Sequence, residues 1–170
     1  MAKKVLILDS CVLCVWLKVP GKETFGSKGD RVDYDMVKAK IEHEMDAGTT
    51  FVLPLASIIE TGNHITHADN NYTQIQQFAD LMVASADEKT PWAAFTQQGT
   101  LWNTDGLKAL AERWRKTAPA KQSLGDASIV DVAYFYCQMG YVVEIFTGDK
   151  MLKSHQPPKP VEIGIPRRRK

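Results

Sequence analysis

The sequence predicts an α/β fold in which a central parallel β-sheet is flanked by helices on both faces (α/β/α). The aliphatic run VLIL, residues 5–8, is typical of a strand that is buried on both faces of a parallel sheet. Residues 49–53 and 141–146 are also apolar and rich in β-branched side chains, and we expect them to form two more strands. Between these runs, apolar residues recur at helical spacing, an alternation that is typical of βαβ units.

The helices are predicted from apolar stripes and from the residues that stop them. In residues 71–89, for example, Ile75, Phe78 and Met82 share one face of a helix. Glycine or proline follows several of these stretches, as expected at helix ends. The expected helices span residues 12–17, 34–47, 56–67, 71–89, 105–117, 123–140 and 149–154, with Thr104 as the N-cap of the fifth.

The remaining segments have weaker patterns. Residues 21–33 are rich in Gly, Lys and Asp and are expected to form a loop, whereas the aromatic-rich residues 91–103 give no clear prediction. A weak final strand is expected at residues 161–165. The apolar stripe of residues 105–117 predicts that Trp114 lies in the core.

Length and composition predict one soluble globular domain. The chain has 170 residues, 44% of them hydrophobic and 24% charged, which is enough for one full core and short for two. We expect the domain to span residues 1–166, followed by a basic tail at 167–170. The odd number of cysteines, three, argues against a disulfide framework and favours a reducing cytoplasm. No apolar stretch is long enough to span a membrane, and basic and acidic residues balance at 21 and 20, so net charge points to no particular partner.

Four acids follow the predicted strands or lie near the start of the helices beside them. Asp9 comes directly after the first strand, and Asp149 lies soon after the strand at residues 141–146. Glu60 belongs to the helix after the second strand, and Asp126 to the helix that precedes the strand at residues 141–146. Because the functional crevice of an open α/β sheet lies at the carboxyl ends of its strands, we expect these acids to meet there.

Taken singly, three of these acids have ordinary structural interpretations. Asp126 suits a helix cap, Asp149 a turn and Glu60 a solvated helix face. Asp9 is different, because an acid beside a buried strand has to be paired, protonated or bound to a metal. Together, four carboxylates repel one another unless a cation lies among them, and oxygen ligands suit Mg²⁺ or Mn²⁺. The chain has no glycine-rich nucleotide loop, so we expect the cation to meet a phosphate of a larger substrate.

Four segments that carry these acids resemble a known family. In chain order they read LILDSCVLCVWL, LPLASIIETGN, SLGDASIVDVA and EIFTGDKML, and they resemble the acidic motifs of PIN-domain nucleases, most of all the VapC-type toxin ribonucleases. The resemblance runs from residue 5 to about residue 152. It implies that Asp9, Glu60, Asp126 and Asp149 are the catalytic and metal-binding acids.

The resemblance also carries expectations about mechanism and partners. It implies a metal-dependent endoribonuclease that hydrolyses RNA with Mg²⁺ or Mn²⁺ and acts as the toxin of a toxin–antitoxin pair. A small antitoxin protein and a homodimer are the partners it implies. Ser10 and Thr147 match the hydroxyl residues that often stand beside the first and last Asp of the family. Residues 21–33 and 91–103 look like additions to the compact toxins, which leaves open a housekeeping or defence ribonuclease, or a binding module that no longer cuts.

Further side chains are candidates for supporting roles. Asn63 lies one helical turn after Glu60 and either supports it or is solvated. Asp131 has either a secondary metal role or a surface role, since a helix turns it away from Asp126. His64 and His67 have the spacing of two zinc ligands, but no further ligands stand at a usual distance, so a polar helix face is favoured.

The Cys11-x-x-Cys14 pair and the first strand also suit other chemistries. A thioredoxin-type dithiol uses this spacing, but its context is absent and packing of the helix on the sheet is favoured. A haloacid-dehalogenase phosphatase needs a second Asp two residues after the first, where this chain has Cys11. The basic cluster of residues 113–121 suits either the helix dipole or an RNA backbone.

Overall fold

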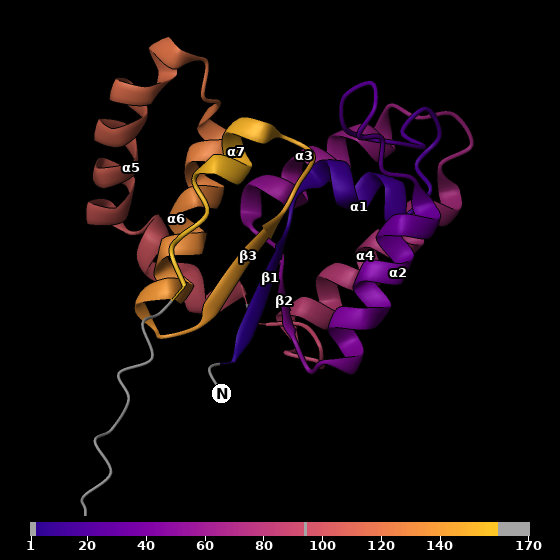
Figure 1. The fold of residues 1–170 in the computed structure, drawn as a ribbon, viewed down its shortest axis with the longest axis horizontal. Coiled ribbons are helices and arrows are strands. Elements are labelled where there is room, and N and C mark those ends of the chain that lie inside the picture. The colour runs from indigo at the N-terminus through magenta and orange to yellow at the C-terminus, as the bar shows by residue number, and fades with distance from the viewer. Residues whose placement is uncertain (1–2, 94, 160–170) are drawn as a thin grey trace, which may run out of the picture.

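The computed structural model describes residues 3–93 and 95–159. Within these residues the chain forms an α/β fold with three strands and seven α-helices (Figure 1). The strands are β1 (Lys4–Leu8), β2 (Thr50–Val52) and β3 (Val142–Phe146). They form one parallel sheet in the order β2-β1-β3, with Val5 of β1 opposite Thr50 on one side and Val143 on the other. The predicted central parallel sheet is therefore confirmed.

The helices fall close to their predicted positions. They are α1 (Ser10–Trp16), α2 (Tyr34–Asp46), α3 (Leu55–Thr66), α4 (Tyr72–Ala86), α5 (Thr104–Thr117), α6 (Leu124–Gln138) and α7 (Lys150–Ser154). Two 3-10 helices, η1 (Phe95–Trp102) and η2 (Ala118–Ala120), flank α5. Helix α5 begins one residue earlier than expected, because the Asn103 side chain, and not that of Thr104, caps it by accepting from the Gly106 N–H.

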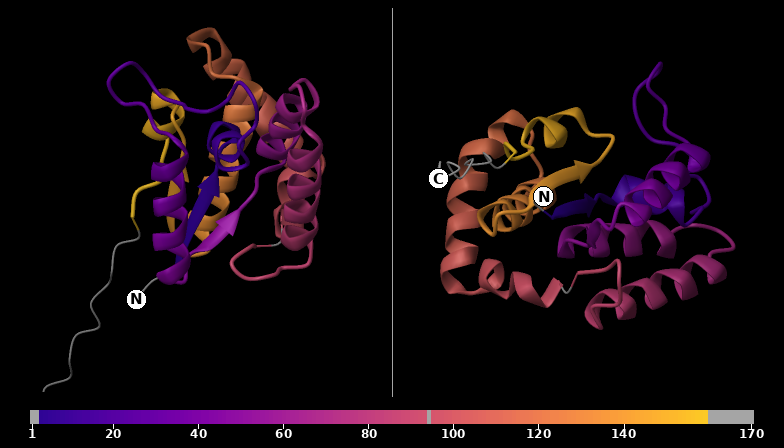
Figure 2. Two further views of the ribbon diagram at one scale, coloured as in Figure 1. Left: turned by 90° about the vertical axis from the view of Figure 1, so that its right-hand side faces the viewer. Right: turned by 60° about the horizontal axis from the view of Figure 1, so that its bottom comes forward.

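Helices cover both faces of the sheet, each over a core of its own. Leu6 and Leu8 of β1 point to one face, where they pack with apolar residues of α1, α2, α3 and α4. Val5 and Ile7 alternate to the other face and pack with residues of α6 and α7. Both faces of β1 are thus dry, as its unbroken aliphatic sequence predicts. Figure 2 shows the sheet between these two groups of helices, an arrangement compatible with α/β/α layers.

Residues 91–93, part of the segment that gave no prediction from sequence, pair with the outer edge of β2. The Phe51 N–H donates to the Pro91 carbonyl at 2.7 Å, and the Ala93 N–H donates to the Phe51 carbonyl at 2.8 Å. The Trp92 ring packs on Phe51 and on Trp16 of α1, with ring centres 5.4 and 6.0 Å apart. This segment is therefore built into the sheet and its core.

The predictions for Trp114 and for the C-terminal residues have different outcomes. Trp114 is 38% exposed, and its ring N–H donates to the Gln122 carbonyl at 3.1 Å, so the prediction that it lies in the core was wrong. Helix α5 buries Leu110 while leaving Leu107 48% exposed, because it packs mainly through one position of its stripe. The expected strand at 161–165 and the basic tail at 167–170 lie outside the described residues. None of the helices in the described ranges combines the length and the apolar character needed to cross a membrane.

An ion-pair network around one buried glutamate lies at the amino end of the sheet. Glu44 of α2 is only 4% exposed, and it accepts hydrogen bonds from Lys4 Nζ at 2.5 Å and from Thr49 Oγ1 at 2.6 Å. Burial raises the pKa of this carboxyl, but the donation from Lys4 and Thr49 outweighs it and lowers the pKa to about 2. Lys40 and Glu144 complete the network. It joins α2 to β1 and β3 far from the four acids.

Candidate active site

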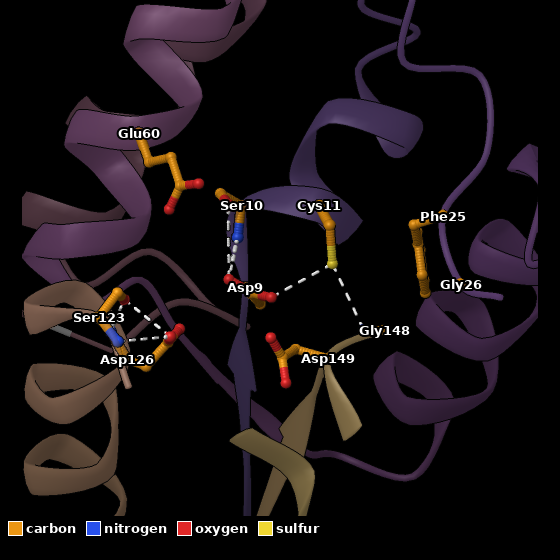
Figure 3. A pocket seen from close by; sticks show the side chains of 10 residues that line it. All are labelled: Asp9, Ser10, Cys11, Phe25, Gly26, Glu60, Ser123, Asp126, Gly148 and Asp149. Atoms are coloured by element: carbon orange, nitrogen blue, oxygen red, sulfur yellow. Dashed lines mark hydrogen bonds between the residues drawn. The ribbon is translucent and has the colours of Figure 1, made fainter. Parts of the chain in front are cut away.

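A pocket of about 390 Å³ opens at the carboxyl ends of β1 and β3. The four acids expected from the sequence, Asp9, Glu60, Asp126 and Asp149, all line it. Figure 3 shows them approaching from four elements, with the side chains of Glu60, Asp126 and Asp149 directed toward the space around Asp9. In the strand order β2-β1-β3, the chain leaves the central strand toward one side and returns on the other, and such a switch point is where α/β sheets form crevices.

Asp9 is held rigidly at the floor of the pocket. It is the N-cap of α1 and is only 7% exposed. Its Oδ1 accepts from the Ser10 backbone N–H at 2.7 Å and from the Ser10 hydroxyl at 3.4 Å. Its Oδ2 accepts from the Thr147 hydroxyl at 2.6 Å and from the Cys11 thiol at 3.2 Å. Both oxygens of this buried carboxylate are therefore satisfied by neighbouring donors, which is how a buried acid avoids the cost of lost hydration.

Thr147 ties the first acid to the last one. Its hydroxyl donates to Asp9 and accepts from the Asp149 backbone N–H at 2.9 Å. Thr147 is itself buried, so it lies beneath the pocket and does not line it. The expected role of Thr147 beside the last Asp thus has a geometric counterpart, a bridge between the ends of β1 and β3.

Asp149 and Asp126 are both oriented by helix N-termini. Asp149 is the N-cap of α7, and its Oδ1 accepts from the Met151 and Leu152 N–H groups at 2.7 and 3.0 Å. The ordinary structural interpretation of Asp126 was a helix cap. Asp126 is instead the third residue of a capping box at the start of α6, and Ser123 is the N-cap. The Ser123 hydroxyl donates to Asp126 Oδ2 at 2.7 Å and accepts from the Asp126 N–H at 2.9 Å. Caps thereby fix two of the pocket's carboxylates.

Glu60 is exposed and has the fewest hydrogen bonds of the four acids among the described residues. It lies in the second turn of α3 and its side chain is 56% exposed, with its Oε1 3.8 Å from His64 Nε2. No cap or buried donor is seen on it among the described residues. Solvent screens such an exposed helix pair, so His64 contributes little to holding it. Glu60 therefore forms an adaptable wall opposite the rigid Asp9.

The four acids face one pocket without closing around an ion-sized space. Among residues 3–93 and 95–159, no group of three or more His, Cys, Asp and Glu side chains stands close enough together to hold a metal ion. The donor set itself consists of carboxylate oxygens, with the Ser10 and Ser123 hydroxyls beside them. Such oxygens are the ligands of hard cations such as Mg²⁺ and Mn²⁺.

Cys11 lies in the pocket, which sequence reasoning missed when it assigned both cysteines to packing. Its Sγ donates to Asp9 Oδ2 and accepts from the Gly148 N–H at 3.4 Å. Burial, followed by the charge of Asp9, raises the pKa of the Cys11 thiol far above its usual range. Cys14 is a core residue as expected, and burial raises its pKa to about 11. Two thiols that resist ionisation lack the thiolate that dithiol chemistry needs.

The loop at residues 21–33 forms the remaining wall, another feature that the sequence did not reveal. Phe25 and Gly26 line the pocket, and Phe25 pairs with Val32 through two backbone hydrogen bonds of 3.1 and 2.9 Å. The Phe25 ring stands edge-on to Phe146 and directly against Gly148. A Cβ at Gly148 would lie 2.4 Å from Phe25 Cδ2, so this glycine lets the loop approach the end of β3.

Two of the four supporting residues expected from sequence lie elsewhere. Asp131 is half-buried, pairs with Arg113 of α5 and lines a separate hollow, outside the acid pocket. Asn63 is exposed on α3 and borders neighbouring grooves instead of the acid pocket. The ring Nδ1 of His67 is 2.7 Å from the Asn63 carbonyl oxygen, an arrangement of the polar helix face that the sequence favoured over zinc.

The site is thus an acidic pocket in which Asp9 is locked by hydrogen bonds, one of them from Thr147 beneath the pocket. Its upper walls come from α3, α6 and the loop that holds Phe25. Carboxylate oxygens from several elements around one pocket are the kind of ligand set that hard cations prefer. No protein-family model, curated protein or solved structure matches the chain in the comparisons with known proteins.

Proposed function

We propose that the chain is a metal-dependent endoribonuclease of PIN-like type that hydrolyses phosphodiester bonds in RNA. One observation carries the proposal: four carboxylates from four separate elements line a single pocket at the carboxyl edge of a parallel sheet. Carboxylates gathered in this way repel one another, and a divalent cation is the usual means of balancing them. The order of the acidic segments in the sequence supports the PIN-like assignment.

The residues present fit a hard divalent cation. Asp9, Glu60, Asp126 and Asp149 would hold it, and each offers carboxylate oxygen. Cys11 is the one thiol among the pocket's lining residues, so oxygen donors dominate the set and favour a hard cation. When bound, Mg²⁺ or Mn²⁺ would supply activation of water and stabilisation of charge on the scissile phosphate.

The chain's own groups prepare the pocket for that chemistry. Thr147, Ser10 and Cys11 hold Asp9 in one orientation. The Met151 and Leu152 N–H groups donate hydrogen bonds to Oδ1 of Asp149, and the Ser123 hydroxyl donates one to Oδ2 of Asp126. Glu60, being exposed, is the group that is best able to adjust when a substrate phosphate enters. Positioning of this kind lowers the reorganisation that the reaction requires.

A cleavage assay with paired variants tests the proposal. Mixed RNA is incubated with the purified protein in the presence of chelator, Mg²⁺ or Mn²⁺, and products are resolved on a denaturing gel. We expect cleavage with either ion, none with chelator, and none with Glu60→Gln. Glu42→Gln is the matched control, because Glu42 is also an exposed helix glutamate, 62% against 56% for Glu60, and lies outside the pocket.

Loss of activity in Glu60→Gln with full activity in Glu42→Gln would exclude a contaminating nuclease. Absence of cleavage under all conditions would favour instead a PIN-like binding module, for which the open spacing of the acids is the supporting observation. The toxin role is a separate part of the proposal. It predicts growth arrest on expression in a bacterial host, dependent on Asp149 and relieved by a neighbouring gene product that acts as antitoxin, and harmless expression of an active nuclease would favour a housekeeping or defence role.

A further inference from the structure

A second hollow, of about 530 Å³, lies between α3, α5 and α6 and has a different character from the acid pocket. Its walls are mainly apolar, and three of the residues on its rim remain largely exposed: Ile59 at 55%, Leu107 at 48% and Leu124 at 48%. Trp102, at the end of η1, supplies an aromatic ring to the same groove. Contiguous apolar side chains left open to water in this way mark a binding surface.

This apolar groove is continuous with the acid pocket. Glu60 and Ser123 line both hollows, so the two share a rim formed by α3 and the start of α6. Figure 3 shows both residues at one side of the acid pocket, away from Phe25. A polymer whose phosphate lies among the acids therefore has its adjoining unit beside the groove.

The lining suits a nucleobase more than a charged segment. A base has two apolar faces and a polar edge, and it stacks on aromatic rings and packs on aliphatic side chains. Trp102, Ile59 and Leu107 offer such surfaces, and Asn63 and Ser123 stand on the rim as polar groups for the edge of the base. A base inside a duplex cannot reach such a groove, because its faces are already stacked.

We infer that this groove, defined by Ile59, Trp102, Leu107 and Leu124, binds an unpaired base of the nucleotide next to the scissile phosphate. The inference rests on the proposed nuclease function and adds to it a binding site: a groove on α3, α5 and α6 for the base beside the cleaved bond. The groove then selects unpaired segments, while the acid pocket acts on their backbone.

The test uses a single-stranded RNA oligonucleotide and its copies that each lack one base at a defined position. Binding is measured with Ca²⁺, an oxygen-binding cation, in place of Mg²⁺, and cleavage is measured separately with Mg²⁺. For the wild type, removal of the base next to the cleaved bond is expected to weaken binding roughly 5- to 150-fold, the range of one base–aromatic stack. Leu107→Glu and Trp102→Ala should each weaken binding of the full oligonucleotide and abolish the difference between full and abasic RNA.

Val83→Glu is the matched control for Leu107→Glu, because Val83 is an apolar residue 56% exposed on α4 and outside the groove. Leu107 is itself half exposed, so its variant is expected to fold, which circular dichroism checks. Equal binding of full and abasic RNA by the wild type would overturn the inference while leaving metal-dependent cleavage, and hence the proposed function, intact. Unchanged RNA binding by Leu107→Glu together with a change in the protein's oligomeric mass would also overturn it and assign the groove to a protein partner. Absence of both binding and cleavage would overturn both proposals.

Discussion

Replacing Asp9 by Asn tests how the floor of the acid pocket is held. Repulsion among four carboxylates taken alone predicts that removing one charge stabilises the fold. The hydrogen bonds around Asp9 predict the opposite, because Oδ2 accepts from both Thr147 and Cys11. An asparagine would present an NH₂ group to these two donors, or to the Ser10 N–H if the amide is turned round.

The magnitudes decide the sign. A hydrogen bond to a charged group contributes roughly 1.5–3 kcal/mol, and the variant loses at least one, from the Thr147 hydroxyl or from the Ser10 N–H. Relief of repulsion is smaller, since Glu60 and Asp149 are exposed and a pair of charges about 4 Å apart in water interacts by about 1 kcal/mol. The two terms together predict a net loss of about 0.5–2 kcal/mol in the free energy of unfolding of Asp9→Asn.

Urea unfolding in the presence of chelator, followed by circular dichroism, measures this difference without any assumption about activity. The Thr147→Val variant and the double variant complete a thermodynamic cycle, in which the two changes should be strongly non-additive because they remove the same hydrogen bond. A stabilised Asp9→Asn protein, or additive losses in the cycle, would show that the Thr147 donor does not determine the state of Asp9.

The structure leads to three further expected outcomes. The pKa of Glu44 is lowered from an ordinary 4.5 to about 2, so the stability that it contributes should be full above pH 4.5 and lost as the pH falls toward 2. In urea unfolding at different pH values, Glu44→Gln should remove this dependence. The upper limit of the effect is about 3 kcal/mol, and solvent screening at the lysine partners reduces it. Thr147→Ser should retain Mn²⁺ affinity in calorimetric titrations, whereas Thr147→Val should lose roughly 10- to 100-fold, and equal affinities would contradict the bridge between Asp9 and Asp149. Because burial and the charge of Asp9 raise the pKa of Cys11, iodoacetamide at pH 8 should label it by mass spectrometry only after unfolding, and rapid labelling of the folded protein would refute that assignment.

Features that depend on local pattern could be predicted from the sequence. The run VLIL predicted a central strand because burial on both faces leaves no room for polar alternation, and β1 has both faces covered. The positions of Asp9 and Asp149 at strand ends followed from the same reasoning, since parallel strands bring their carboxyl ends to one edge. The sequence also placed Glu60 and Asp126 at that edge, because the helices that carry them adjoin the strands.

Features that depend on contacts distant in the sequence could not be predicted. The thiol of Cys11 meets Gly148, 137 residues away, and no spacing in the chain indicates this. The approach of Phe25 to the same glycine likewise depends on how a loop folds back. Trp114 was misplaced because a stripe on a helix records apolarity and not how closely the neighbouring layer approaches. The Ser123-x-x-Asp126 box was readable in principle, since Ser followed three residues later by an acid signals a helix start.

The short segment beside β2 has a consequence for how the protein behaves at high concentration. An open strand edge exposes rows of N–H groups to which a strand of another molecule can bind, which is a route to aggregation. At residues 91–93 no N–H group is free to bind such a strand. Pro91 has no N–H, the Trp92 N–H donates to the Lys89 carbonyl at 2.8 Å, and the Ala93 N–H donates to the Phe51 carbonyl. Along residues 91–93 a strand arriving from solution therefore finds no free backbone donor, and this segment gives a poor template for adding another molecule.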